Sequence, residues 1–113
     1  MSDEKLLDLG LLAGYLENLG NQVVGQMLDL YVSQSQVYLE EIRAALEEGS
    51  QKLWQERCHK MKGAAGSVGF VQVHAKLVEI EKSTEPYEQK KQFIKALTDK
   101  NEAAIMAFKA WLA

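Results

Sequence analysis

Residues 22–48 read QVVGQMLDLYVSQSQVYLEEIRAALEE, and this segment carries the strongest structural signal in the chain. Its apolar side chains recur at intervals of three and four residues, the spacing that gathers them on one face of an α-helix. We therefore predict a long amphipathic helix from about Gln22 to Glu48. The residues on its apolar face are Val24, Met27, Leu28, Tyr31, Tyr38, Leu39, Ile42, Ala45 and Leu46.

A second helix is predicted to follow after a tight turn. Gly49 is the residue type that commonly ends a helix, and Ser50 has the side chain of an N-cap. The helix that begins there is expected to end near Gly69. Its apolar stripe consists of Trp54, Cys58, Met61, Ala65 and Val68.

The remaining segments also have helical patterns. A third helix is expected over about residues 70–80, and Pro86 is placed to begin the last one. Upstream, residues 6–19 are predicted to form one or two short helices, interrupted by Gly10 and Gly14. No segment alternates as a strand does, and the connections are short. The predicted fold class is therefore all-α, an up-down antiparallel four-helix bundle with a short N-terminal helical cap.

The composition bounds the class of protein. With 113 residues, 47% of them hydrophobic, the chain is expected to fold as one domain, residues 1–113. A net charge of -3 argues against a nucleic acid or an anionic membrane as the partner, since either would favour a basic surface. The acidic start, Met1 to Glu4, and the single Cys58 predict a cytoplasmic protein without a secretory signal or an intrachain disulfide. A monomer is expected because all apolar faces can be buried internally.

The run from His59 to Gly69, HKMKGAAGSVG, has the apolar spacing of a helix but also contains glycines, which disfavour a helix. At about 100° per residue, His59 lies roughly 140° from the centre of the apolar stripe, so its side chain is expected to face solvent. Gly63 and Gly66 fall within about 40° of His59, and Lys62 within about 60°. Each glycine costs a helix about 1 kcal/mol relative to alanine. Because such local conflicts often mark function, we interpret the bare surface as room for a partner beside His59.

Phosphoryl transfer is the chemistry that would use such a histidine. A neutral imidazole is a nucleophile at physiological pH and forms a phosphoramidate by attacking an activated phosphoryl group. The transfer depends mainly on positioning and charge stabilisation, and the donor arrives with a whole protein domain behind it. We expect Gly63 and Gly66 to admit that domain, Lys62 to place its ammonium near the phosphoryl oxygens, and Lys60 to contribute more diffusely.

The pattern His59-x-x-Lys62-Gly63, followed by Gly66 and Gly69, resembles the histidine-phosphotransfer (HPt) domain family, and most closely the HPt domains that end Arc-type hybrid sensor kinases. The resemblance implies that Nε2 of His59 accepts a phosphoryl group from the aspartyl-phosphate of a hybrid kinase's receiver domain. His59 would then pass it reversibly to the receiver domain of a response regulator. It also implies that Mg²⁺ belongs to the receiver and that this chain brings no metal or cofactor. A free-standing protein and one domain of a hybrid kinase both fit, and the initiating methionine favours the former.

A neighbour for His59 is expected on the third helix. The HPt family places Gln or Glu there, and turn counting reaches the same position. If two helices run antiparallel about a turn near Gly69 and Phe70, the residue level with His59 lies near position 80. Glu81 is the polar residue at that level, and Glu79 is the alternative. A carboxylate that accepts from Nδ1–H would leave Nε2 free to attack.

The surface around His59 is the expected docking site for receiver domains. Beside the reactive group of His59, Lys62 and Glu81, it is predicted to comprise Gln55, Glu56, Lys60, Gly63, Gly66, Ser67 and Gly69.

Several other residues have simpler interpretations. His74 lacks a comparable setting and is expected near the surface without a role. Cys58 is predicted to be a buried hydrophobe rather than a metal ligand, because its spacing to His59 does not suit zinc. Trp54 and Trp111 are expected in the core. The adjacent lysines at positions 90 and 91 are expected to be solvated.

Two alternative functions use other features of the sequence. An autophosphorylating kinase also presents a histidine on a helix, but the chain has no Gly-rich nucleotide loop after a strand and no α/β segment for ATP. A structural or adaptor bundle would need no phosphorylation at all. Gly63 and Gly66 could permit close helix packing instead of docking, but their phase opposite the apolar stripe argues against it.

Overall fold

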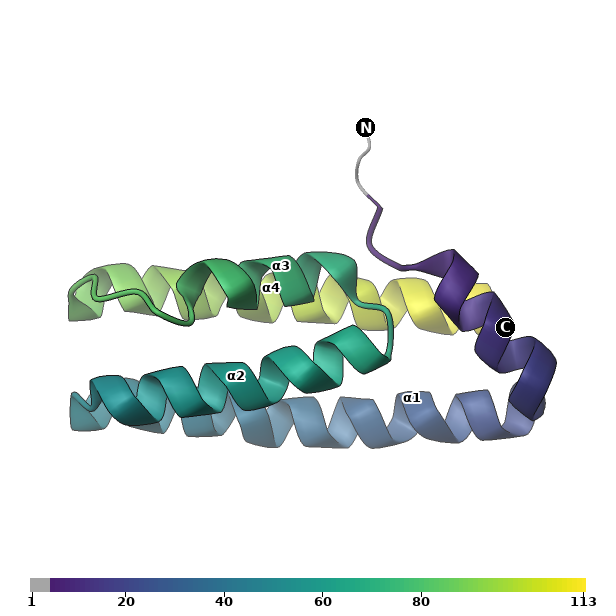
Figure 1. Ribbon diagram of the computed structural model, residues 1–113, viewed down its shortest axis with the longest axis horizontal. Helices are drawn as coiled ribbons and strands as arrows, with labels where there is room; N and C mark the ends of the chain where they lie inside the picture. The colour runs from purple at the N-terminus through teal and green to yellow at the C-terminus, as the bar shows by residue number, and fades with distance from the viewer. Residues whose placement is uncertain (1–4) are drawn as a thin grey trace.

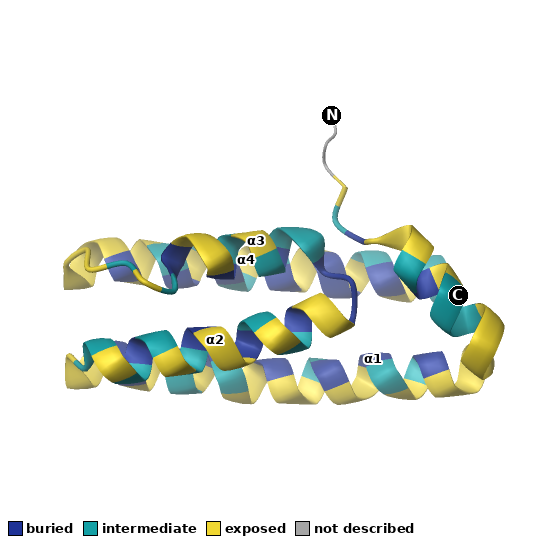
Figure 2. Cartoon of the chain, viewed as in Figure 1, coloured by how far each residue is buried: buried dark blue, intermediate teal, exposed yellow. Residues whose placement is uncertain are grey.

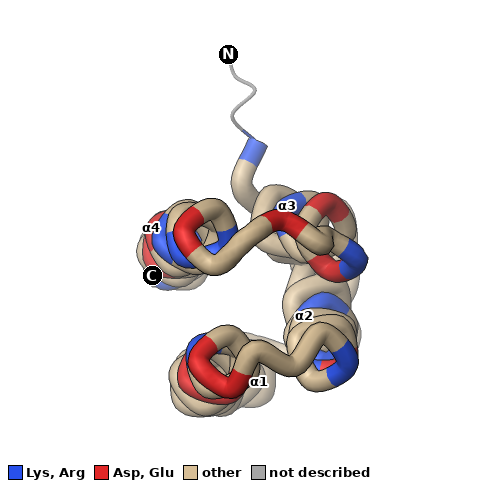
Figure 3. The backbone as a smooth tube through the Cα atoms, turned by 90° about the vertical axis from the view of Figure 1, so that its left-hand side faces the viewer, with Lys and Arg blue, Asp and Glu red and all other residues tan. Residues whose placement is uncertain are grey.

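The computed structural model describes residues 5–113, and its regular elements in that range are helices (Figure 1). They are α1 (Leu9–Glu48), α2 (Gln51–Ser67), α3 (Val71–Ile80) and α4 (Tyr87–Leu112). Viewed end-on, the helices occupy the corners of a bundle in which α2 lies diagonally across from α4 (Figure 3). Successive helices run antiparallel, as short connections require. The predicted all-α bundle is confirmed, and the acidic start at residues 1–4 lies outside the described residues.

The N-terminal part of α1 forms the helical cap, but its boundaries differ from the prediction. Gly10 and Gly14 lie within continuous helix, and the break comes at Gly20, whose φ of 85° and ψ of 165° are essentially restricted to glycine. The chain bends there, so that residues 9–19 cross one end of the bundle (Figure 1). The Asp8 side chain caps this arm by accepting from the backbone N–H of Leu11 at 3.1 Å. The prediction that Gly10 and Gly14 interrupt the helix was wrong, because glycine lowers helix propensity without enforcing a break.

The turns on either side of α2 follow the sequence signals. Gly49 adopts a left-handed conformation with φ 69°, and its N–H bonds to the last carbonyls of α1. The Ser50 hydroxyl accepts from the N–H of Leu53 at 3.1 Å, which confirms it as the N-cap of α2. After α2, Gly69 has φ 72°, and its carbonyl accepts from the N–H of Asp8 at 2.8 Å. The turn between α2 and α3 is thus fastened to the N-terminal arm.

The core lies between the four inner helix faces (Figure 2). Trp54, Phe70 and Phe108 are among its largest fully buried side chains, and Tyr31 packs edge-on against Phe70 with ring centroids 4.7 Å apart. Trp111 is half-buried at the end of this cluster and packs edge-on against Phe108 at 6.0 Å. Trp54 therefore belongs to the core, as predicted, whereas Trp111 is partly buried and packs against the edge of the core. Within residues 5–113, no helix combines the length and hydropathy needed to cross a membrane.

One polar network is buried inside this core. The Tyr31 hydroxyl donates to Oδ1 of Asn101 at 2.6 Å, and Nδ2 of Asn101 donates to the Ser35 hydroxyl at 3.1 Å. Because the bonds join α1 to α4, they fix the register of those two helices.

Candidate functional site

His59 projects from the outer face of α2, opposite the residues that α2 buries. Its side chain is 71% exposed, whereas Trp54, Cys58 and Met61 on the inner face are at most 1% exposed. The helical phase deduced from the sequence is therefore correct. An imidazole in this position is open to an approaching protein.

The two glycines beside His59 have different surroundings. A Cβ atom built on Gly63 would meet nothing within 4 Å, so this position leaves the surface bare, as predicted. A Cβ on Gly66 would lie 3.3 Å from Cδ2 of His74 on α3, which is closer than ordinary van der Waals contact. The alternative explanation, that a glycine permits close helix packing, thus applies to Gly66, because α3 runs along that edge of α2. Glycine here allows His74 to lie against the backbone of α2.

Glu81, at the C-terminal end of α3, lies beside His59. It follows the last residue of α3, and its Oε2 atom is 3.6 Å from Nδ1 of His59. Glu79, the alternative, is exposed and pairs with Lys76 at 3.3 Å. The turn count thus selected the correct residue. The separation exceeds the ~2.7–3.2 Å of an N–H···O hydrogen bond, so the carboxylate adjoins the imidazole without bonding to it.

Lys62 binds the same carboxylate more closely than His59 does. Its ammonium lies 2.6 Å from Oε1 of Glu81, an oxygen shielded from solvent. Hydrogen bonding and charge from Lys62, with a smaller contribution from His59, outweigh the effect of burial and lower the pKa of Glu81 below its ordinary value of 4.5. The structure thus brings together the three predicted reactive residues, with Lys62 held by Glu81 instead of standing free.

A polar network that the sequence analysis missed positions the end of α3. The indole N–H of Trp54 donates to the carbonyl of Ile80 at 2.9 Å, and the amide of Gln51 donates to the carbonyl of Ser83 at 3.0 Å. Lys90 donates to the Gln51 side-chain oxygen at 2.7 Å and lies over the Trp54 ring at 4.8 Å. These bonds bracket Glu81 in the sequence and fix it relative to α2.

Lys90 is only 8% exposed, so the prediction that it is solvated was wrong. The spacing of Lys90 to Ile94 and Leu97, at i+4 and i+7, was the signal that places it on the inner face of α4.

Most of the predicted docking residues lie on the outer side of α2 (Figure 2). Lys60 is 58% exposed and pairs with Glu41 of α1 at 3.6 Å. Gly69 is buried beneath Asp8 and Leu11 of the N-terminal arm, so it does not belong to the exposed surface. Its place in a positive-φ turn explains the glycine instead. Gln55 is half-buried, and the exposed members are Glu56, Lys60, Gly63, Gly66 and Ser67.

The remaining candidate groups do not add to the site. Cys58 is buried, and burial, with a smaller contribution from Glu81, raises the pKa of its thiol to about 12. The described part of the chain holds no group of three or more His, Cys, Asp or Glu side chains suited to a metal ion.

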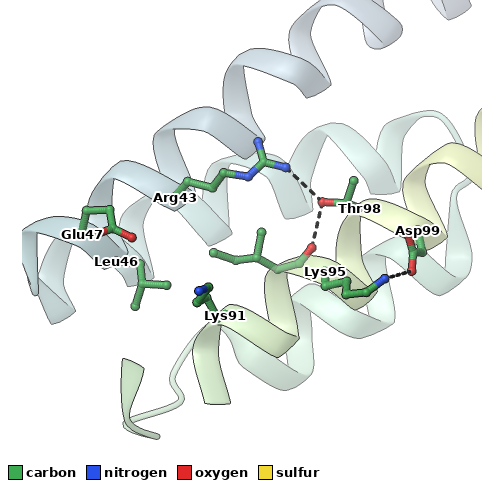
Figure 4. Close-up of a pocket in the computed structure, with 8 residues that line it drawn as sticks. Arg43, Leu46, Glu47, Lys91, Lys95, Thr98 and Asp99 are labelled. Atoms are coloured by element: carbon green, nitrogen blue, oxygen red, sulfur yellow. Dashed lines mark hydrogen bonds and ion pairs between the residues drawn. The ribbon is translucent and has the colours of Figure 1, made fainter. Parts of the chain in front are cut away.

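A hollow of about 370 Å³ lies between α1 and α4 (Figure 4). Arg43 donates to the Thr98 hydroxyl at 3.4 Å across it, and Lys95 pairs with Asp99 at 3.4 Å along its α4 wall. None of its lining residues belongs to α2 or α3, so the hollow is separate from His59. The lining residues are Arg43, Leu46, Glu47, Lys91, Ile94, Lys95, Thr98 and Asp99.

Comparison with solved structures identifies the same architecture in phosphotransfer proteins. The histidine-containing phosphotransfer domain of ArcB from Escherichia coli superposes with a TM-score of 0.83 at 28% identity, covering 97% of this chain and 95% of that one. A solution structure of the ArcB domain gives a TM-score of 0.83 at 27% identity, covering 96% of this chain and 89% of that one. Histidine-containing phosphotransfer protein B (HptB) from Pseudomonas aeruginosa PAO1 gives 0.84 at 23% identity, with 96% of each chain covered, and supports the fold alone.

The sequence comparison assigns the family. No curated protein sequence matches the chain at a significant level. The sequence model of the Hpt domain, however, matches residues 26–105, which include α2, α3 and most of α4. The matched range contains His59, Lys62 and Glu81. Together with the bundle and the exposed histidine, this match shows that the chain belongs to the Hpt domain family.

Proposed function

We propose that this chain is a phosphorelay intermediate whose phosphorylated residue is His59. It accepts a phosphoryl group from the aspartyl-phosphate of a hybrid kinase's receiver domain and passes it reversibly to the receiver domain of a response regulator. The observation that carries the proposal is an exposed imidazole whose Nδ1 edge faces a carboxylate and whose neighbour, Gly63, leaves the surface open. We place this exchange in the cytoplasm, with the chain as a monomer.

The transfer needs only the lone pair of one ring nitrogen. Nε2 of neutral His59 attacks phosphorus, the Nε2–P bond forms, and the P–O bond to the receiver's aspartate breaks, returning its electron pair to the carboxylate. The proton on Nδ1 remains on the ring, where the Glu81 carboxylate lies 3.6 Å away. In the reverse step the ring leaves as the neutral Nδ1–H tautomer. A small rotation of either side chain would convert this proximity into a hydrogen bond that stabilises the charged ring.

The other site residues act on charge and access. Lys62 and His59 both lie next to the Glu81 carboxylate. Once His59 is phosphorylated, the Lys62 ammonium can leave that carboxylate and bind the phosphoryl oxygens. Glu81 orients the ring, and Gly63 admits the partner. Mg²⁺ is supplied by the receiver domain, and we propose that the chain itself acts as a carrier without ATP-dependent kinase activity.

The test separates a carrier from a kinase and from an adaptor. The chain is incubated with a phosphorylated receiver domain and, separately, with ATP and Mg²⁺, and acid-labile, base-stable label is measured. We expect label from the receiver alone, its loss in His59→Gln, and its retention in Glu102→Gln, a control on the exposed face of α4. Label from ATP alone would support a kinase, and no label from a panel of receivers would refute the relay.

A further inference from the structure

A second pair of residues lies across the junction of α2 and α3 in the same register as the reactive pair. His59 faces Glu81, and Gly66 faces His74. Both steps, from 59 to 66 along α2 and from 81 to 74 along α3, span seven residues, which is two helical turns or about 10 Å. His74 therefore lies on the same junction as His59, displaced towards the turn at Gly69.

A hollow opens at this second pair. It has a volume of about 300 Å³ and is lined by Gly66, Phe70, Val71 and His74. Gly66 contributes only backbone to its lining, and the His74 ring, which lies against that backbone, forms one wall. His74 is half-buried. The hollow thus combines the apolar walls of Phe70 and Val71 with one imidazole.

The position of the hollow determines what can cover it. A protein that transfers phosphate to His59 must centre its contact near that residue. A standard interface covers about 800 Å² on each partner, equivalent to a disc with a radius of about 16 Å. At about 10 Å from His59, the hollow falls inside such a footprint. Val78, which is 55% exposed and lies on α3 between His74 and Glu81, adds apolar surface to the same strip.

We propose that the hollow at Gly66 and His74 is a docking contact for the receiver domain, which inserts an aliphatic side chain there and hydrogen-bonds to the His74 imidazole. This inference rests on the proposed relay function and adds a specificity-determining residue on α3. His74 takes no part in the chemical step, because it lies about two turns from the reacting nitrogen. Its contribution is to receiver affinity.

Single-turnover kinetics separate docking from chemistry. Transfer from a phosphorylated receiver is measured against receiver concentration for wild type, His74→Ala and Gly66→Ala, with Glu102→Ala on α4 as the matched surface control. We expect both test variants to raise the half-saturating receiver concentration roughly 5- to 10-fold, with the rate at saturation changed less than twofold. Phosphoramidate used as a small-molecule phosphoryl donor needs no docked domain, so the labelling of His59 by this reagent should be unchanged in both variants. Transfer from the receiver to Glu102→Ala should also be unchanged.

The outcomes distinguish this inference from the function on which it rests. If the wild type receives phosphate from the receiver and both variants keep its half-saturating concentration, the docking contact is refuted and the relay stands. If the wild type receives none from any receiver, the relay and the docking contact fall together. If His74→Ala instead changes the sedimentation of the chain alone, the hollow is a self-association surface and its assignment to the receiver is overturned. Thermal unfolding of each variant confirms that the bundle is intact.

Discussion

At the scale of single residues, the Glu81 carboxylate lies between His59, the proposed site of phosphorylation, and Lys62. Glu81 binds the Lys62 ammonium at 2.6 Å and lies 3.6 Å from Nδ1 of His59. In the unphosphorylated site, the Glu81 carboxylate therefore neutralises the charge of the Lys62 ammonium. A phosphoryl dianion on Nε2 would compete with Glu81 for Lys62, so the lysine can respond to the phosphorylation state of its neighbour.

The Lys62–Glu81 pair should make stability depend on pH in one direction. The pKa of Glu81 is lowered in the folded chain, so its contribution is present above the ordinary value of 4.5 and is lost as pH falls through the folded-state pKa. At pH 7, Glu81→Gln should lower the free energy of unfolding by on the order of 1 kcal/mol. Urea unfolding at several pH values should show this difference shrinking below pH 4.5. A difference that grows in acid would contradict the account, and the exposed Glu79→Gln is the control.

The positions of the site residues could be predicted from the sequence, but the ion pair between Lys62 and Glu81 could not. The position of Glu81 followed from turn counting, because antiparallel helices of fixed rise bring defined residues level with each other. That Lys62 would bind it could not be deduced, because a lysine side chain has several rotamers that reach different partners. The contact of His74 with Gly66 could have been found by the same count applied two turns further along.

At the scale of the elements, α2 presents a helix face from which side chains are missing. Gly63→Gln should raise the free energy of unfolding by roughly 0.5 kcal/mol, because glutamine is the better helix former and a Cβ here meets nothing within 4 Å. The added side chain should obstruct the partner domain, so transfer from a receiver should slow at least tenfold while phosphoramidate labelling of His59 persists. Ala103→Gln on α4 serves as the control. Unchanged receiver transfer in Gly63→Gln would show that the bare face is not needed for docking.

The bend in α1 depends on the backbone of one glycine. Gly20→Ala should lower the free energy of unfolding by about 1–3 kcal/mol, because φ 85° and ψ 165° are accessible to glycine and strained for alanine. Gly14→Ala is the matched control, since Gly14 is helical and its added Cβ would meet nothing within 4 Å. That control should be stabilising by up to about 1 kcal/mol. Equal effects of the two substitutions in urea unfolding would contradict the assigned position of the bend.

The helices could be predicted from the sequence, and the bend could not. Residues 22–48 show their helical phase directly, and Gly49 and Ser50 mark the turn that follows. Gly10, Gly14 and Gly20 are alike in sequence terms, because each lowers helix propensity within a segment that is otherwise compatible with a helix. Which of them breaks the helix depends on where the arm must cross the bundle so that its own Leu12 is buried, which is a tertiary requirement.

At the scale of the whole molecule, a buried hydrogen-bond network holds α1 and α4 in register. Tyr31→Phe should lower the free energy of unfolding by about 1–3 kcal/mol, because it leaves Asn101 without its 2.6 Å donor in the core. Tyr38→Phe is the control, since Tyr38 is only half-buried. Thermal or urea unfolding checks the difference. Equal stabilities of the two variants would show that the network contributes no specific stabilisation.

The bundle presents His59 on the exposed face of α2, and we propose that its Nε2 atom carries the phosphoryl group. The most direct measurement is NMR of the chain labelled with ¹⁵N-histidine, recorded before and after phosphorylation by a phosphorylated receiver domain. We expect the phosphoryl group to appear on Nε2 of His59, with the proton on Nδ1 beside Glu81 and with His74 unmodified. Phosphorylation of His74, or of Nδ1 of His59, would contradict it.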